Sequence, residues 1–165
     1  SLSTDAAKAA RIFHFVRTHL SYDAASPAAN RGALQGYQAG RGVCQEYASL
    51  FVALARAAGL PSRVANGYVL LDRTGKPAAD ASVRAVRHQW AEYYDRQRGW
   101  VPVDPTLAAS PERSVDAPAY VRENHGDRPV RGSVRGGKVR ISRSTAVQAS
   151  LAGPGPAARV TWITR

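Results

Sequence analysis

The segment Gly40-Arg41-Gly42-Val43-Cys44-Gln45-Glu46-Tyr47 joins a glycine-rich turn to a long apolar stripe, and it decides how the chain around it folds. From Tyr47 onward, apolar residues recur at three- and four-residue steps over the following turns, which predicts an amphipathic helix. Gly59 and Pro61 come next, a pair typical of a helix end. The sequence therefore predicts a helix that begins at Cys44 and ends near Gly59.

A second amphipathic pattern precedes this segment. Apolar residues recur at helical spacing between Asp5 and about Leu20, and Thr4 or Ser3 is suited to cap the start of that helix. Residues 21–43 are polar and rich in Ala, Gly and Ser, so we expect mostly loop there.

After Pro61 the hydrophobic period changes from that of a helix to that of a strand. Residues 62–71, 87–94 and 99–103 read as three strands, separated by a turn-rich excursion and by a short turn at residues 95–98. Helices followed by consecutive antiparallel strands predict an α+β fold in which the N-terminal helices pack on an antiparallel sheet.

The tail from Ser110 onward is less regular. Residues 130–142 alternate apolar and basic residues around glycines, which predicts a twisted hairpin with a basic solvent face, and residues 160–164 predict a closing edge strand. The length of 165 residues suits one domain, with a core over about residues 5–107 and a hairpin and tail over residues 108–165.

The composition excludes several classes of site. A single cysteine allows neither an intrachain disulfide nor a Cys-rich zinc site, and the histidines lack the spacing of a metalloprotease helix. The sequence also has no phosphate-binding glycine loop. None of these patterns predicts a metal site, and we expect no cofactor. The sequence also has no apolar run long enough to span a bilayer and no signal-peptide pattern at its start. The compartment stays open, because an unpaired cysteine fits a bacterial cytoplasm and survives in a periplasm too.

The charge of the chain is strongly positive. Lys and Arg number 23 against 12 acidic residues, which gives a formal net charge of +11. A field of this sign attracts anionic partners or acidic substrates. The basic run over residues 128–143 has no interleaved aromatic residue, so we interpret it as a solvated hairpin face that is open to an anionic partner rather than as a base-stacking surface.

Cys44 is the first candidate for chemistry because of its place at the start of a helix. The free N–H groups and the positive end of the helix dipole favour a thiolate there, and they also suit an oxyanion formed on an attacked carbonyl. Gly40 and Gly42 permit a close approach. The alternative is an inert, buried cysteine that packs as a small apolar residue.

His88 and Asp104 complete a possible catalytic set. His88 opens a predicted strand, where it would take the thiol proton, and Asp104 closes the next strand, where it would orient the imidazole. Taken alone, His88 also fits a surface or core histidine of a strand, and Asp104 also fits an ordinary turn that ends a strand. Trp90 is a candidate to shield the site from water, and Glu92 is a candidate partner for an arginine. A side-chain oxyanion donor could be Gln35, Tyr37 or Gln38. We expect His14 and His19 to be surface residues of the first helix.

The order of these motifs resembles the transglutaminase-like superfamily, in its compact bacterial branch of papain-like cysteine enzymes. The resemblance runs through the segments at residues 42–48, 59–64, 67–68, 88–92 and 100–106, and extends into the tail at residues 126–127, 129–132 and 135–137. It implies a papain-like α+β core with a triad of Cys44, His88 and Asp104. It further implies that a thioester forms on Cys44 and that its acyl group passes to water or to an amine.

Within that resemblance we expect hydrolysis of peptide or glutamine-type amide bonds in a protein or peptide substrate, ahead of amine cross-linking. The chain offers no carboxylate loop of the kind that binds calcium, and the large animal cross-linkers are calcium-regulated. Substrate specificity is expected from residues 21–43, 72–87 and 105–127. The alternative is a non-catalytic binding module whose basic surface holds an anionic polymer or a protein.

Overall fold

A computed structural model describes residues 4–80, 82–108 and 119–123, together with the backbone of short strands at residues 133–134, 140–142, 158–159 and 161–163. The chain divides into two compact units. The first unit comprises Ser1–Ala65 and Gln89–Val115, and the second comprises Asn66–His88 and Asp116–Arg165. The single-domain organisation stays a prediction.

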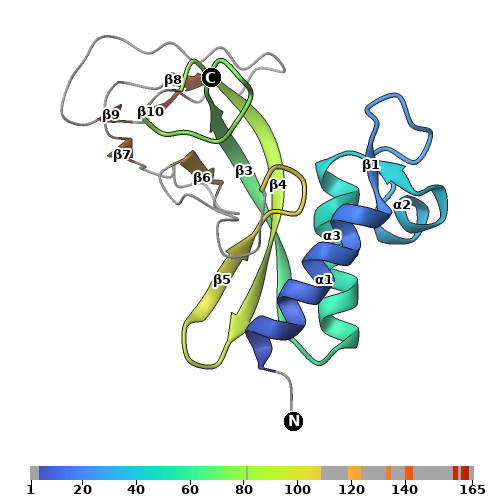
Figure 1. The fold of residues 1–165 in the computed structure, drawn as a ribbon. Helices are drawn as coiled ribbons and strands as arrows, with labels where there is room; N and C mark the ends of the chain where they lie inside the picture. Colours follow the sequence, from blue (N-terminus) through green and yellow to red (C-terminus); the bar gives the residue numbers. More distant parts are fainter. Residues whose placement is uncertain are drawn as a thin grey trace. The chain divides into compact units, whose positions relative to one another are not determined.

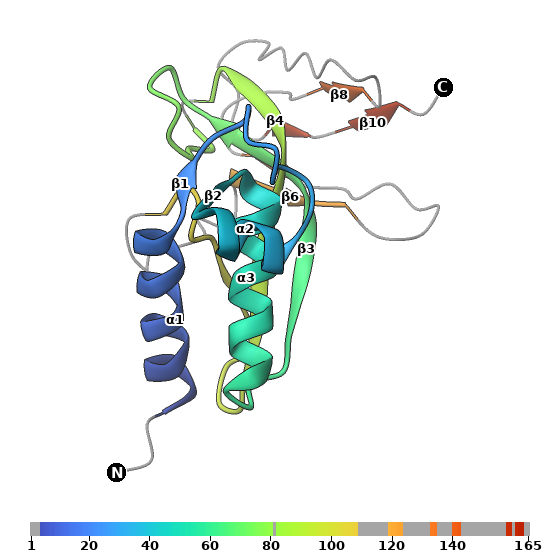
Figure 2. The same cartoon turned by 90° about the vertical axis from the view of Figure 1, so that its right-hand side faces the viewer.

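Two antiparallel helices dominate the first unit, α1 (Asp5–His19) and α3 (Cys44–Ala57), as the sequence predicts (Figures 1 and 2). The Thr4 hydroxyl caps α1 by accepting the Ala7 N–H at 3.1 Å. Lys8 Nζ donates to the Ala58 carbonyl at 3.3 Å, at one end of the pair. At the other end, the Tyr47 hydroxyl donates to the Leu20 carbonyl at 2.8 Å, so the start of α3 lies beside the end of α1.

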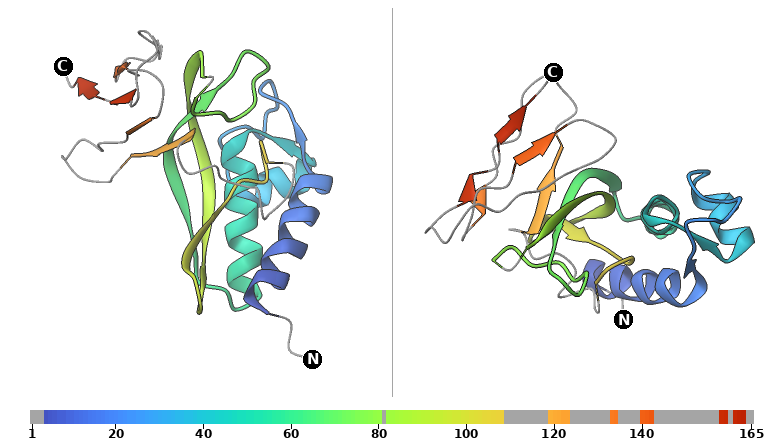
Figure 3. Two further views of the ribbon diagram at one scale, coloured as in Figure 1. Left: turned by 60° about the vertical axis from the view of Figure 1, so that its left-hand side comes forward. Right: turned by 90° about the horizontal axis from the view of Figure 1, so that it is seen from above.

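The core of the first unit lies between these helices and one face of the sheet (Figure 3). The sheet contributes the last part of β4 (Arg84–Asp95) and all of β5 (Gly99–Val103), paired antiparallel from Ala91↔Val103 to Asp95↔Gly99. Phe13, Phe51 and Val103 are almost completely buried there. Burying each such side chain contributes about 1.5–3 kcal/mol, which is why the apolar stripes fix the helices on the sheet.

Residues 21–43 are more ordered than the predicted loop. They hold β1 (Ser21–Tyr22), the short helix α2 (Ala33–Ala39) and β2 (Arg41–Gly42), with β1 and β2 paired in parallel. The prediction of mostly loop is therefore wrong for α2. Gly40 ends α2 in a left-handed conformation and donates its N–H to the carbonyls of Gly36 and Tyr37, and packing against α3 stabilises the helix further.

The remaining strands confirm the antiparallel sheet and correct one boundary. The sheet has the strand order β5-β4-β3-β6, where β3 is Ser62–Leu71 and β6 is Tyr120–Arg122. In the second unit β3 pairs antiparallel with β6, and a Cβ on Gly67 would lie 2.0 Å from the Val121 carbonyl oxygen, so only glycine fits. Because β4 begins at Arg84, His88 lies inside the strand and does not open it.

The tail pairs differently from the prediction at the strands that the structure describes. Strand β7 (Ser133–Val134) pairs with β9 (Ala158–Arg159), and β8 (Arg140–Ser142) pairs with β10 (Thr161–Ile163). The two halves of the predicted hairpin thus have other partners, and the hairpin is wrong at these residues. A strand does lie within residues 160–164 as predicted. The basic solvent face predicted over residues 128–143 lies outside the described side chains.

Candidate active site

Cys44 is the first residue of α3 and is partly exposed. In the first turn of α3 the N–H groups of Glu46 and Tyr47 donate to the Val43 carbonyl at 2.9 and 3.2 Å. The N–H groups of Cys44 and Gln45 are the ones left to face whatever approaches the sulfur. The chain reaches Cys44 through Gly42, where an added Cβ would lie 2.6 Å from both Cβ and Cγ of Glu46. Gly42 is therefore required by close packing, as the sequence predicts.

Glu46 fixes the start of α3 from inside the protein, and it was not singled out from the sequence. Its side chain is fully buried, and its carboxylate accepts three backbone N–H groups. One oxygen accepts those of Arg31 and Gly32, each at 2.9 Å, and the other accepts that of Val43 at 3.0 Å. A glutamate three residues after an N-cap is the acidic half of a capping box, a signal hidden here because Val43 has no side-chain oxygen.

Tyr22 is the second residue that the sequence did not reveal. The β1–β2 register sets Tyr22 opposite Gly42, and the Asp23 N–H donates to the Gly42 carbonyl at 2.9 Å. The Tyr22 side chain is 61% exposed. Partial burial raises the pKa of Tyr22, and the negative charge of the Cys44 thiolate raises it further. Tyr22 is thus an exposed aromatic neighbour of the sulfur, brought there by a pairing across residues far apart in sequence.

The three predicted oxyanion donors differ in their surroundings. The Tyr37 ring stacks on His19 with 4.7 Å between ring centroids, and His19 Nε2 donates to the Tyr37 carbonyl at 2.8 Å. That ring is engaged with the end of α1. Gln35 and Gln38 instead line a hollow of about 470 Å³ on the same short helix. Which of them serves an oxyanion stays a prediction.

Asp104 directly follows β5 and is completely buried. One carboxylate oxygen accepts the N–H groups of Thr106 at 2.9 Å and Leu107 at 3.3 Å. These bonds are those of a strand-ending turn, and they also fix the orientation of the carboxylate. A side chain buried this deeply requires such partners.

His88 belongs to the second unit, whereas Cys44 and Asp104 belong to the first. The imidazole is buried, and its centroid lies 6.1 Å from that of the Tyr120 ring within the same unit. The structure thus describes the place of each predicted triad residue by itself. Their convergence stays a prediction.

Trp90 and Glu92, the two candidates that follow His88 on β4, are both buried. Trp90 is buried at 3% exposure. Glu92 accepts from Arg63 Nε at 2.6 Å, which confirms the predicted arginine partner. The same Arg63 guanidinium lies 3.8 Å from the centroid of the Trp100 ring, so Glu92 and Trp100 together hold the Arg63 side chain.

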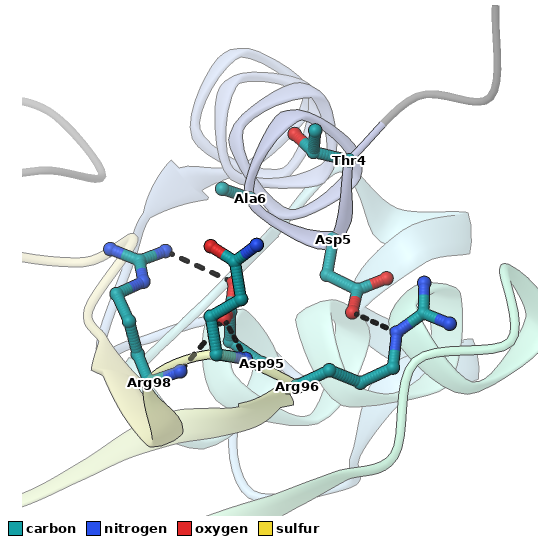
Figure 4. A pocket seen from close by; sticks show the side chains of 7 residues that line it. Thr4, Asp5, Ala6, Asp95, Arg96 and Arg98 are labelled. Carbon is teal, nitrogen blue, oxygen red and sulfur yellow. Dashed lines mark hydrogen bonds and ion pairs between the residues drawn. The ribbon is translucent and has the colours of Figure 1, made fainter.

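A second hollow, of about 540 Å³, lies between the start of α1 and the turn that joins β4 to β5 (Figure 4). Its charges are paired with one another: Arg96 Nε lies 3.1 Å from the Asp5 carboxylate, and an Arg98 nitrogen lies 3.4 Å from that of Asp95. Because its cations and anions neutralise each other, we assign it no role in catalysis.

Over the part of the chain that the structure describes, no group of three or more His, Cys, Asp and Glu side chains could hold a metal ion. Within that same part, none of the helices has the length and apolar character needed to cross a bilayer.

Comparisons with known proteins give relatives for part of the chain. A protein-glutamine gamma-glutamyltransferase of Pseudomonas aeruginosa is 39% identical over 74 residues, which are 44% of this chain and 11% of that protein. The uncharacterized protein YebA of Bacillus subtilis is 33% identical over 69 residues, which are 39% of this chain and 9% of YebA. The chain therefore spans about a tenth of the length of these two relatives.

A solved structure supports the fold. A proposed cysteine protease from Cytophaga hutchinsonii superposes with a TM-score of 0.52 at 24% identity, over 69% of this chain and 34% of that one. This similarity confirms the predicted α+β fold. The family model described as the transglutaminase-like superfamily matches residues 1–105, a span that contains Cys44, His88 and Asp104 and ends before the tail segments of the expected resemblance. The chain therefore belongs to the transglutaminase-like superfamily.

Proposed function

We propose that this chain is a cysteine-dependent acyl-transfer enzyme that attacks peptide or glutamine-type amide bonds through Cys44. Membership in the superfamily supports cysteine-dependent acyl transfer. The observation that carries the proposal is the setting of the sulfur: Cys44 is partly exposed at the first residue of α3, behind a glycine that packs on a buried glutamate.

In the proposed triad, His88 takes the Cys44 proton and Asp104 orients the imidazole. The superfamily model supports this assignment, because its match over residues 1–105 contains Cys44, His88 and Asp104. The turn N–H groups on Asp104 hold its carboxylate in one orientation. A fixed carboxylate that accepts an imidazole N–H sets both the tautomer and the orientation of the ring.

The first half-reaction forms a thioester. The thiolate sulfur bonds to the amide carbonyl carbon, and the developing oxyanion meets the free N–H groups at the start of α3. The carbon–nitrogen bond then breaks, and the nitrogen leaves as ammonia or an amine with the proton that His88 returns. In the second half-reaction His88 takes a proton from water, the hydroxide adds to the thioester, and the carbon–sulfur bond breaks to regenerate the thiolate.

We favour water over an amine as acceptor, and a glutamine carboxamide as one class of acyl donor. The name of the Pseudomonas aeruginosa relative supports glutamine as a donor. The sequence offers no carboxylate loop of the kind that binds calcium, and this is our reason for placing hydrolysis ahead of calcium-regulated cross-linking.

The test offers a glutamine-peptide library to the purified chain, with and without an added primary amine, and follows ammonia release and product mass. We expect ammonia in both arms and mainly the hydrolysed product. Cys44→Ala and His88→Ala should abolish turnover without changing the circular dichroism spectrum. At neutral pH, iodoacetamide should alkylate Cys44 faster than it alkylates the thiol of glutathione.

Salt-sensitive binding of an anionic polymer that survives Cys44→Ala, with no turnover of any peptide, would instead support a non-catalytic binding module. Alkylation of Cys44 no faster than that of glutathione would also contradict the proposal.

A further inference from the structure

The hollow of about 470 Å³ beside α2 has a cationic and amide lining. Its polar side chains come from Ser26, Arg31, Gln35, Gln38 and Arg41, and no Asp or Glu lines it. Gln35 and Gln38 lie three residues apart on α2, which places them on one face of that helix. The hollow thus offers guanidinium and amide N–H donors together.

The two arginines are available to a ligand. Among the described residues, no carboxylate forms an ion pair with the Arg31 guanidinium. Arg41 lies 3.6 Å from the Asp23 carboxylate, but both side chains are substantially exposed, at 58% and 34%. An exposed pair at this distance contributes little, so a ligand carboxylate can share or replace it.

Hydrogen bonds fix the wall of the hollow before any ligand arrives. The Asp23 carboxylate accepts the Ala25 N–H at 2.9 Å, and the buried Ser26 hydroxyl accepts the Ala28 N–H at 3.1 Å. The Arg31 backbone is held by Glu46 through a bond of 2.9 Å. A site already in its binding conformation loses less entropy on binding, which favours a specific ligand.

The hollow adjoins the candidate nucleophile along the chain. Arg41 stands three residues before Cys44, so at most about 11 Å separates their Cα atoms. An extended peptide covers that distance in about four residues, at roughly 3.3 Å for each residue. A substrate with its acyl group at Cys44 can therefore reach the arginines with a nearby side chain.

We propose that the hollow beside α2 binds the carboxylate side chain of an acidic peptide substrate, within about four residues of the glutamine that reaches Cys44. This inference rests on the proposed function and adds the substrate class. Guanidinium groups bind carboxylates through paired N–H donors, and the amides of Gln35 and Gln38 supply further donors. The net charge of +11 favours the approach of the same substrates.

The experiment measures binding in a Cys44→Ala background, where no turnover is needed. The acidic probe is a fluorescein-labelled peptide that carries glutamates at positions two to four on each side of the reactive glutamine. The neutral probe is the same peptide with glutamine in place of those glutamates. We expect Arg31→Gln and Arg41→Gln each to weaken binding of the acidic probe about tenfold at fixed salt. Neither should change binding of the neutral probe.

The control variant is Arg11→Gln, which removes one positive charge from an exposed site on α1 and should leave both affinities within twofold of the parent. Equal losses of affinity for the acidic probe in all three variants would show that only the overall positive charge attracts it, and would overturn the site. Undiminished binding of the acidic probe in Arg31→Gln and Arg41→Gln would also overturn it. A competition experiment gives a third outcome: polyphosphate displaces the acidic probe from the Cys44→Ala parent but not from the two arginine variants, and an unlabelled glutamate peptide displaces it from neither. That outcome would show that the hollow binds phosphate and not a peptide carboxylate, and it would overturn the proposal too. Probe selectivity without turnover by the Cys44 protein would contradict the proposed function and leave the binding site standing.

Discussion

Gly42 has no room for a side chain, because the space beside its Cα is filled by Glu46. A Cβ there would lie 2.6 Å from Cβ and Cγ of Glu46, and neither atom is the free end of a flexible chain. We expect Gly42→Ala to lower the free energy of unfolding by about 1–3 kcal/mol, the usual cost of overpacking. Urea denaturation measures this, and iodoacetamide alkylation should slow because the shift reaches Cys44. A variant as stable and as reactive as the parent would contradict the packing argument.

The ionisation of Tyr22 reports its distance from the sulfur. The thiolate repels a phenolate, so its charge raises the pKa of Tyr22 beyond the increase that burial causes. Removing the charge with Cys44→Ala should therefore lower the pKa of Tyr22, although burial keeps it above the ordinary value. Titration of ¹³Cζ-labelled tyrosine by NMR measures the change, with the Tyr22 signal assigned from Tyr22→Phe.

Tyr93 provides the internal control for this titration. Burial also raises the pKa of Tyr93, but its charged neighbours are Arg98, Asp95 and Asp5, and not Cys44. Its titration should be the same in the parent and in Cys44→Ala. Equal movement of Tyr22 and Tyr93, or none at Tyr22, would mean that Tyr22 does not sense the thiolate.

At the scale of elements, Glu46 joins the loop before α2 to the first turn of α3. Glu46→Gln keeps the shape but leaves one amide nitrogen facing backbone N–H donors that need an acceptor. We expect a loss of roughly 2–3 kcal/mol of unfolding free energy, since an unsatisfied buried donor costs about 1–3 kcal/mol.

Glu123→Gln is the matched control for that substitution. Glu123 makes an ion pair at 3.2 Å with Arg87, whose side chain is 69% exposed, and such surface pairs contribute about 0–1 kcal/mol. Urea unfolding of both variants should show a small change at Glu123 and a large one at Glu46. Similar changes in the two variants would contradict the role assigned to Glu46.

The two long helices were predictable from the sequence because their buried apolar residues recur at helical spacing. Strand β3 was predictable because a β-branched and apolar run follows the helix-ending Gly59 and Pro61. Periodicity predicted α1, α3 and β3 close to their observed bounds. The pairing of β1 with β2 was not predictable, since each strand has two residues and the partners are twenty positions apart. Tyr22 was missed for the same reason: its proximity to Cys44 depends on that pairing and on no local pattern.

The strand that contains His88 shows a related limit. The residues before Arg87 lack a clear alternation, so the expected strand began three residues late. Pairing with neighbouring strands extends β4 where its own sequence does not. By contrast Cys44 and Asp104 occupy the predicted ends of their elements, because the glycine before the helix and the Asp-Pro-Thr turn are local signals.

At the scale of the whole molecule, the excess of 23 basic over 12 acidic residues sets the response to salt. We expect KM for an acidic glutamine peptide to rise several-fold between about 50 and 200 mM NaCl, while kcat changes little, because screening weakens encounter and not chemistry. Initial-rate kinetics at each salt concentration test this.

A neutral peptide of the same length serves as the reference in these assays, and its KM should change much less. A rise of equal size for both peptides would show that the salt acts on the protein itself. A fall in kcat for either peptide would point to a change at Cys44.

The parallel pair of Ser21–Tyr22 with Arg41–Gly42 closes the intervening chain into a ring whose two ends meet. A segment with touching ends can be lengthened, shortened or exchanged at small entropic cost, since closure of a loop depends only weakly on its length. Residues 23–40 thus form a closed module, which Glu46 ties to α3 through the N–H groups of Arg31 and Gly32. A module transplanted from a relative would have to keep these two contacts. It would exchange Arg31 and the face of α2 in the hollow, while Arg41 and the backbone leading to Cys44 would stay.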